Sequence, residues 1–300
     1  MSLTELLNIA ANKENFRSLT DYIKFCRRYL DFLTDGIQAE IVSQNESNYR
    51  FFQYREDGNF NITRPVNANL MYTVENGAVI EEGFLRVLRA AKEVATADEA
   101  NRLIIRKTIY TIQQSIGATL DALPAGQSNT ARKINGDLFE RLMRLLIQAV
   151  GVDCRTGVIR VPVVVDGVKE FAMSYQHDLL LFREDELKVI GSVKTSSKDR
   201  LDKIFVDKFL YNRLTETDIP HIAIFLNDVQ RKRTRKENKY GINSTFLPGH
   251  FRGYTVKLNA LDGVYYCDIR PAMTTDEFLR EHIKTIDCFF CDDVQDFMGK

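Results

Sequence analysis

A run of strand-like segments enclosed by two helical segments constrains the fold of this chain more than any other feature. The strand-like segments are rich in β-branched and aromatic residues, and the helical ones repeat apolar side chains three and four positions apart. In order, these are a helix over 135–150, strands over 158–166, 170–182 and 187–195, a helix over 202–214, and strands over 221–227 and 254–261. This order predicts an α/β (α+β) fold in which helices flank a mixed β-sheet.

The first part of the chain has a different pattern. Helical spacing predicts helices over 3–12, 16–34, 80–97 and 98–119, and imperfect alternation around Asp57-Gly58 predicts a hairpin over 48–63. A turn-prone stretch of small residues follows at 123–130, which favours a boundary there. We therefore predict a mainly helical N-terminal region, 1–122, and a second domain, 123–300.

Composition restricts the class of protein further. With 44% apolar residues, the 300-residue chain can bury a sizeable core. Its 41 basic and 41 acidic side chains cancel, so any nucleic-acid surface must come from local segregation of charge. No stretch approaches the roughly 20 apolar residues of a membrane helix, and the N-terminus lacks the order of a signal peptide. Together with five scattered cysteines, this predicts a cytoplasmic protein with no membrane partner.

One carboxylate and one lysine are expected to meet on neighbouring strands. Asp178 begins the apolar part of segment 170–182, and a charged turn leads from there to Lys194 at the end of the next strand. Period-two alternation places Ser192 and Lys194 on one face of that strand. Mg²⁺ prefers carboxylate oxygens, and phosphodiester hydrolysis needs a cation near the attacked phosphate. This hairpin could supply both, although an edge lysine and a solvated aspartate would show the same spacing.

These residues resemble the PD-(D/E)xK nuclease superfamily, with His177 in place of the proline and Ser192 in place of the second acid. Ser192-x-Lys194, followed by the triplet Lys198-Asp199-Arg200, looks like the CCGG-reading branch of type II restriction endonucleases. The resemblance covers roughly residues 130–270. It implies that an acid from the following helix replaces the missing one, and Asp207, 13 residues after Lys194, occupies such a place.

A further acid lies on the helix before the first catalytic strand, where this superfamily often has a glutamate. The helix over 135–150 contains Glu140, at the border of its apolar face. Glu140 could lean toward a metal, or it could pair with Arg144 at i+4 as an ordinary surface residue. The resemblance implies Mg²⁺ held by Asp178, Asp207 and Glu140, with Lys194 at the phosphate and Ser192 in a supporting position.

Lys198, Asp199 and Arg200 have a chemical reason to read DNA. In the major groove, guanine presents N7 and O6 acceptors that Arg and Lys bind, and cytosine presents an N4 donor that Asp accepts. A cation-acid-cation triplet beside the catalytic strand therefore suits a CC/GG site. The alternative is a solvated loop that caps the helix over 202–214.

The strongest segregation of charge lies at 231–239. Arg231, Arg233, Arg235 and Lys236 belong to this run, which suits phosphate contacts, with a solvated loop as the alternative. Residues 240–254 are then predicted to form a long polar and aromatic loop. His250 and Arg252 in this loop could reach bases or phosphates, or could pack with their aromatic neighbours.

The sequence therefore predicts a type II restriction endonuclease that uses Mg²⁺ to hydrolyse double-stranded DNA at a palindromic site with a CC/GG core. The resemblance implies a homodimer, with a tetramer also possible, a cognate DNA methyltransferase and a bacterial cytoplasm. Region 1–122 would serve DNA binding or dimerisation. Two alternatives stay open: a structure-specific repair or recombination nuclease of the same superfamily, and a non-catalytic DNA-binding regulator on a decayed nuclease fold.

Overall fold

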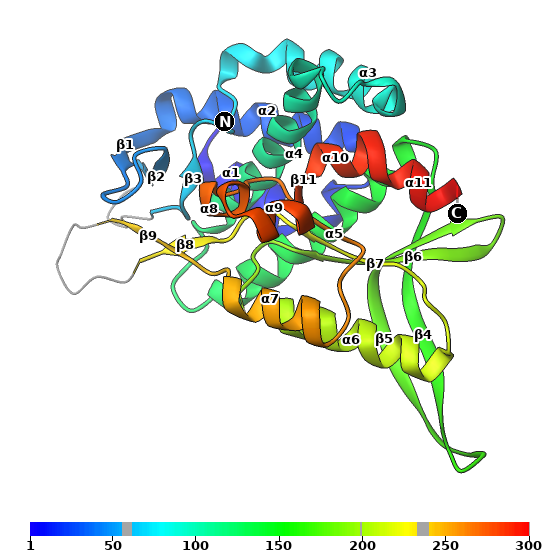
Figure 1. Cartoon of the computed structure of the whole chain (residues 1–300). Helices are drawn as coiled ribbons and strands as arrows, with labels where there is room; N and C mark the ends of the chain where they lie inside the picture. The colour runs from blue at the N-terminus through cyan, green and yellow to red at the C-terminus, as the bar shows by residue number, and fades with distance from the viewer. Residues whose placement is uncertain (56–61, 199, 233–239, 300) are drawn as a thin grey trace.

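A mixed β-sheet lies at the centre of the molecule, with helices on both faces (Figure 1). The structure is a computed structural model that describes residues 1–55, 62–198, 200–232 and 240–299. Within these residues the sheet has six strands in the order β11-β10-β7-β6-β5-β4. Its strands are β4 (Asp153–Val165), β5 (Val168–Arg183), β6 (Glu186–Lys194), β7 (His221–Phe225), β10 (Gly263–Tyr266) and β11 (Ile283–Thr285). The predicted α/β (α+β) fold with a mixed sheet flanked by helices is confirmed.

The helices account for most of the remaining chain. They are α1 (Leu3–Ala11), α2 (Leu19–Gly36), α3 (Phe84–Arg89), α4 (Glu99–Leu120), α5 (Ser128–Ala149), α6 (Leu201–Thr215), α7 (Pro248–Lys257), α8 (Pro271–Thr275), α9 (Glu277–His282), α10 (Ile286–Cys288) and α11 (Val294–Gly299). Two small sheets complete the fold, one of β1 (Ile37–Val42), β2 (Tyr49–Tyr54) and β3 (Val66–Asn67), and one of β8 (Val229–Arg231) and β9 (Ile242–Ser244).

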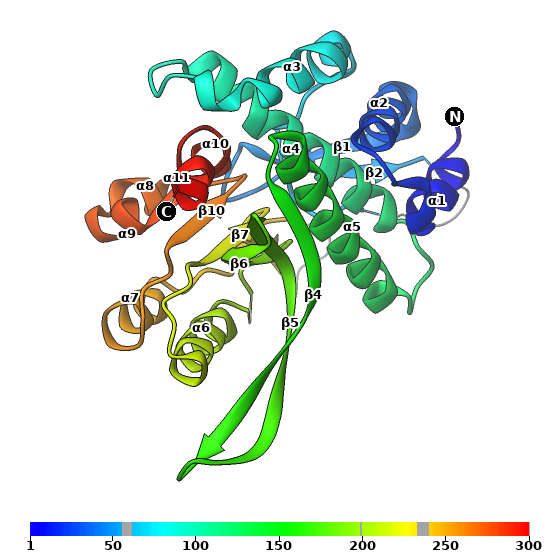
Figure 2. The ribbon, with the colours of Figure 1, turned by 90° about the vertical axis from the view of Figure 1, so that its right-hand side faces the viewer.

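Helices α5 and α6 cover opposite faces of the main sheet (Figure 2). Val189 and Val193 of β6 belong to the same buried cluster as the apolar side of α5. Ile190, between them, packs instead with Tyr211 of α6. The period-two alternation of β6 therefore fixes which side chains face each helix.

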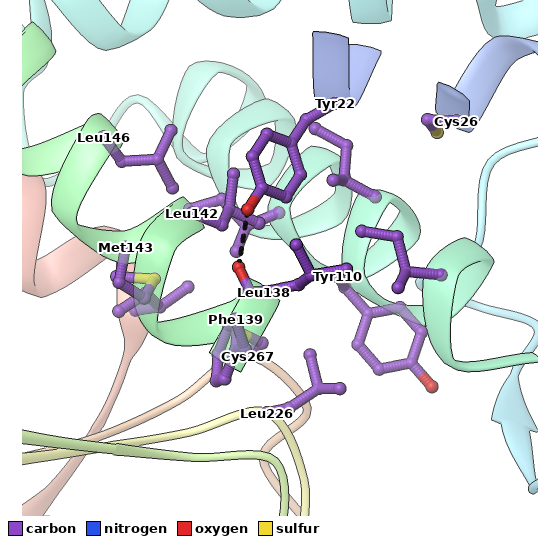
Figure 3. Packing of buried hydrophobic residues seen from close by; sticks show 14 of the residues in the cluster. Tyr22, Cys26, Tyr110, Leu138, Phe139, Leu142, Met143, Leu146, Leu226 and Cys267 are labelled. Carbon is purple, nitrogen blue, oxygen red and sulfur yellow. Dashed lines mark hydrogen bonds between the residues drawn. The ribbon is translucent and has the colours of Figure 1, made fainter. Parts of the chain in front are cut away.

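Helix α5 is held in place by a fully buried face and by long-range hydrogen bonds, one of which is drawn in Figure 3. The buried side chains shown there are Leu138, Phe139, Leu142, Met143 and Leu146. The Tyr22 hydroxyl of α2 donates to the carbonyl oxygen of Leu138 at 2.8 Å. The helix begins at Ser128 rather than at the predicted 135, because its first turns, with Ala131 buried, continue the same helical face. Any acid on α5 is therefore presented from a rigid element.

Two tight turns join the three strands that the sequence analysis singled out. Asp166 and Gly167, at the tip of the β4–β5 hairpin, both have positive φ, as do Glu184 and Asp185 between β5 and β6. Two-residue turns with this backbone match the right-handed twist of antiparallel strands. The predicted order of strand, turn and strand through this part of the chain is therefore confirmed.

Two predicted elements differ from the structure. The predicted strand over 254–261 is wrong, as is the loop over 240–254, because residues 248–257 form α7. Pro248 begins that helix, and Phe251 and Tyr254, three positions apart, both pack against Phe205. The missing strand is β10, which follows. In the predicted hairpin over 48–63, the two arms meet at the antiparallel bridge Gln53–Ile62, β2 also pairs with β1, and the turn at 57–58 lies outside the described residues.

The predicted boundary at 122/123 separates residues that share a core. One buried hydrophobic cluster contains side chains of α1, α2 and α4 together with side chains of α5 and β6. The division into two domains stays a prediction. Among the helices of the described chain, none is long and apolar enough to cross a membrane.

Candidate active site

Asp178 lies at a bulge of β5, at the point where β5 separates from β6. β5 carries one more residue than β4 here, and such a bulge redirects side chains. The ladder between β5 and β6 runs as far as the pair Leu179–Gly191. Beyond it, the Asp178 carboxylate accepts a hydrogen bond from the Val193 amide at 2.8 Å. The bond fixes Asp178 against the end of the neighbouring strand.

Lys194 brings two carboxylates together at this point. Its Nζ lies 2.5 Å from Asp178 Oδ2 and 3.4 Å from Glu140 Oε1. The predicted meeting of Asp178 and Lys194 on neighbouring antiparallel strands is confirmed. The partner of Glu140 among the described ion pairs is Lys194, which corresponds to the inward orientation rather than to a surface pair with Arg144.

The protonation of Glu140 is sensitive to this environment. Burial and, to a smaller extent, the negative charge of Asp178 raise the pKa of Glu140 to about 7, while Lys194 acts in the opposite direction. A second positive charge near Glu140 and Asp178 would favour the ionised carboxylates. The pair is therefore suited to take up a cation.

Ser192 and Asp207 lie on the other side of the sheet from α5. Ser192 alternates with Val193 and so belongs to the face that α6 covers. Lys194 has the same place in the alternation, but it ends β6, and its ammonium reaches Glu140 of α5. Asp207, on α6, accepts a hydrogen bond from Lys203 at 2.6 Å, and no described contact joins it to Lys194. The ring of His177 is buried, and burial lowers the pKa of His177. The negative charges of Asp207 and Asp178 act in the opposite direction, so His177 is coupled to both acids.

A cleft of about 1090 Å³ opens around Lys194 and Glu140. Its walls come from the segment before β3, the α4–α5 connection, the first turns of α5, the end of β6 and β8. Among the described residues, basic side chains outnumber acidic ones in the lining. The basic ones are Arg64, Arg132, Lys133, Lys194, Lys198, Arg200 and Arg231, and the acidic ones are Asp121, Asp137 and Glu140. A polyanion would find compensating charge there.

Two residues of the predicted base-reading triplet belong to this cleft. Lys198 and Arg200 both line it, and Lys198 Nζ donates to Gln230 Oε1 at 3.1 Å. Arg200 immediately precedes α6. Asp199 lies outside the described residues.

The other predicted DNA contacts are divided. Arg231 lines the cleft, but its guanidinium donates to the carbonyl oxygens of Ile62 and Thr63, each at 2.6 Å, so it holds a wall of the cleft together. Arg233, Arg235 and Lys236 lie outside the described residues. His250 and Arg252 are on α7, away from the cleft lining, and Arg252 pairs with Asp276.

The sequence analysis missed several basic residues of the cleft. Arg132 and Lys133 lie two turns before Glu140 on α5, and that spacing could have indicated them once the helix was extended to Ser128. Arg64 could not be found this way. Its guanidinium forms two hydrogen bonds to Asp121, 57 positions away in the sequence.

The acids of the cleft fit a magnesium ion. No group of three or more His, Cys, Asp or Glu side chains within the described parts of the chain could hold a metal. Mg²⁺ usually needs one or two carboxylates, with waters and substrate phosphate as the other ligands. The Lys194 ammonium between Asp178 and Glu140 indicates that these two carboxylates converge on a place for a cation.

Comparisons with known proteins place the fold. No family model and no curated protein matches the sequence. The structure is similar to that of the type IIP restriction endonuclease Kpn2I, with a TM-score of 0.69 and 17% identity over 99% of this chain and 97% of that one. It also matches a complex of the restriction endonuclease PspGI with substrate DNA, with a TM-score of 0.43 and 14% identity over 75% of this chain and 91% of that one. The first similarity establishes a shared fold, and the second is too distant to support an inference.

Proposed function

We propose that the protein is a type II restriction endonuclease that hydrolyses double-stranded DNA in the presence of Mg²⁺, at a palindromic site with a CC/GG core. One observation carries the proposal: Lys194 pairs with Asp178 and Glu140 at a cleft whose charged lining residues are mostly basic. The shared fold with a restriction endonuclease supports it. We also propose a homodimer and a cognate methyltransferase.

Each residue of the cluster has a proposed role. Asp178 and Glu140 would hold Mg²⁺, which polarises a phosphoryl oxygen and lowers the pKa of bound water. The Lys194 ammonium donates to the attacked phosphate and stabilises the charge that develops as water adds to phosphorus and the P–O bond breaks. The Val193 amide keeps Asp178 oriented. The proposed further acid is Asp207 of α6, which pairs with Lys203 in this structure, and Ser192 keeps its proposed supporting position on β6.

Specific recognition would come from the loop that follows β6. Lys198 and Arg200 line the cleft next to Lys194, which suits contacts to bases near the cleaved phosphate. Arg132 and Lys133, on the opposite wall, suit contacts to the phosphate backbone. In this proposal the loop after β6 contacts the DNA bases, and α5 contacts the phosphate backbone.

A plasmid digest tests the activity. The purified protein is incubated with a sequenced plasmid in Mg²⁺, in Ca²⁺ and in EDTA, and the fragment ends are mapped. We expect discrete fragments in Mg²⁺ with ends at one CC/GG-containing palindrome. Cleavage in Mg²⁺ without a common sequence would favour a structure-specific nuclease, and specific binding without any cleavage would favour a regulator.

A further inference from the structure

The two-stranded sheet of β8 and β9 (Figure 1) carries two amide side chains on one of its faces. Gln230 of β8 pairs in register with Asn243 of β9, and cross-strand neighbours project from the same face of a sheet. The opposite face packs against β2, because Val229 and Ile242 belong to one buried cluster with side chains of that strand. Of the two amides, Gln230 is the one that lines the cleft.

Gln230 is in direct contact with the loop that we propose to recognise bases. Its Oε1 accepts a hydrogen bond from Lys198 Nζ at 3.1 Å, and none of the hydrogen bonds within the described chain uses its Nε2. An amide oxygen has two lone pairs, and an ammonium group has three donors. Gln230 and Lys198 can therefore keep their mutual bond while each of them contacts a further group in the cleft.

A network of hydroxyl groups joins this loop to β8 and β9. The Thr245 hydroxyl, directly after β9, donates to the carbonyl oxygen of Asp228 at 2.8 Å. It also lies 3.2 Å from Ser196 Oγ and 3.1 Å from Ser197 Oγ. Because Asp228 directly precedes β8 and the two serines belong to the loop after β6, the network positions the two elements together.

We propose that Gln230 reads an adenine in the base pair directly outside the CC/GG core. In the major groove, adenine presents an N6 donor and an N7 acceptor, and the amide of glutamine matches both with Oε1 and Nε2. A two-stranded ribbon fits into that groove, where Lys198 would bind guanine. The contact between Lys198 and Gln230 then places their bases in adjacent pairs. The inference rests on the proposed function and adds an A·T pair to the site that the protein recognises.

Binding to duplexes that differ at one position tests this assignment. Palindromic duplexes with a CCGG core carry A·T, T·A, G·C or C·G at the pair directly outside it, and dissociation constants are measured in Ca²⁺. We expect the wild type to bind one of the two A·T-containing duplexes at least about tenfold more tightly than either G·C-containing one. Gln230→Ala should lose this preference and still discriminate against a scrambled core. Replacing the outer adenine by 7-deazaadenine should weaken binding of the wild type but not of Gln230→Ala.

Asn243→Ala is the matched control, because it removes the neighbouring amide, which is not among the described residues that line the cleft. It should keep the preference for the outer A·T pair. Equal weakening of all four duplexes by Gln230→Ala would make Gln230 a support of Lys198 and would overturn the inference. A wild type that prefers CCGG to scrambled DNA but ignores the outer pair overturns only this inference. A wild type that binds CCGG and scrambled DNA alike overturns the proposed specificity as well.

Discussion

Two carboxyl groups in this protein, the half-buried Glu140 and the fully buried Asp268, share a raised pKa but differ in their surroundings. Burial raises the pKa of Glu140 to about 7 and that of Asp268 also to about 7. Glu140 lines the cleft, next to a second acid and a lysine. Asp268 is 1% exposed and accepts hydrogen bonds from the Tyr49 hydroxyl at 2.9 Å and from Asn67 Nδ2 at 2.7 Å.

The comparison separates burial from function. Tyr49 and Asn67 belong to β2 and β3, so Asp268 ties the N-terminal strands to the end of β10, where its oxygens are occupied by neutral donors. Glu140 and Asp178 instead share the Lys194 ammonium, and Glu140 and Lys194 line an open cleft. A raised pKa thus marks a desolvated acid, and only access and a shared cation mark a candidate site.

The largest expected effect is on the rate of DNA cleavage, and it should distinguish the residues around Lys194 from Asp268. Lys194→Ala and Asp178→Asn should each lower the cleavage rate by about 10²- to 10³-fold or more, because each removes stabilisation of the attacked phosphate. Asp268→Asn should stay within a few fold of the wild type, provided that it is folded. Single-turnover cleavage of a mapped site measures both. Asp178→Asn cutting at the wild-type rate would contradict the assignment.

The acid on α6 provides the next largest effect. If Asp207 supplies the carboxylate that Ser192 lacks, Asp207→Ala should lose at least about tenfold in cleavage rate, and Ser192→Ala much less. The double variant Ser192→Glu with Asp207→Ser should retain some activity. Lys203→Ala is the control, because it removes the ion-pair partner of Asp207 but leaves the acid. Unimpaired cleavage by Asp207→Ala would reject this role.

The candidate site and Asp268 also show how much could be predicted from the sequence. The meeting of Asp178 and Lys194 was predictable, because both lie on one local hairpin whose alternation is visible in the sequence. The choice of Glu140 between Lys194 and Arg144 was not, because it depends on how α5 packs on the sheet. Asp268 gave no signal, since its partners are 201 and 219 positions away. Tyr254 and Val256 of α7 and Leu258 directly after it alternate like a strand, but the packing of Phe251 and Tyr254 on Phe205 favours the helix.

Recognition of DNA should depend on the residues that line the cleft and not on the buried residues around Asp268. Arg200→Ala should cost about 1–3 kcal/mol in binding to a CC/GG site in Ca²⁺, because it removes a contact to guanine, and should leave binding to scrambled DNA nearly unchanged. Arg132→Ala should weaken both DNAs equally and flatten the salt dependence. A salt series with both DNAs separates the two. Equal weakening of both DNAs by Arg200→Ala would make its loop a phosphate contact and remove the CC/GG assignment.

The dependence on magnesium should change with Glu140 and not with Asp268. Glu140→Gln keeps the shape of the side chain but loses a charged oxygen ligand, so the Mg²⁺ concentration for half-maximal cleavage should rise by about tenfold or more. Asp268→Asn should leave that concentration unchanged. Cleavage over a Mg²⁺ titration measures this effect. An unchanged Mg²⁺ requirement in Glu140→Gln would leave Glu140 as a structural partner of Lys194.

The smallest expected effect concerns the stability that Asp268 controls. Its pKa is near 3.8 when unfolded and about 7 when folded, so between these values the folded state holds a proton that the unfolded state has lost. The contribution to stability is therefore complete below pH 4 and is lost as the pH rises to 7, with a slope of at most about 1.4 kcal/mol per pH unit. The side chain in Asp268→Asn cannot titrate. In this variant the slope of the unfolding free energy against pH should therefore be smaller over this range, by at most about 1.4 kcal/mol per pH unit. Urea unfolding in EDTA between pH 5 and 8 measures the slope. If Asp268→Asn keeps the wild-type slope, then the buried carboxyl does not titrate with a raised pKa, and the likeness between the two acids disappears.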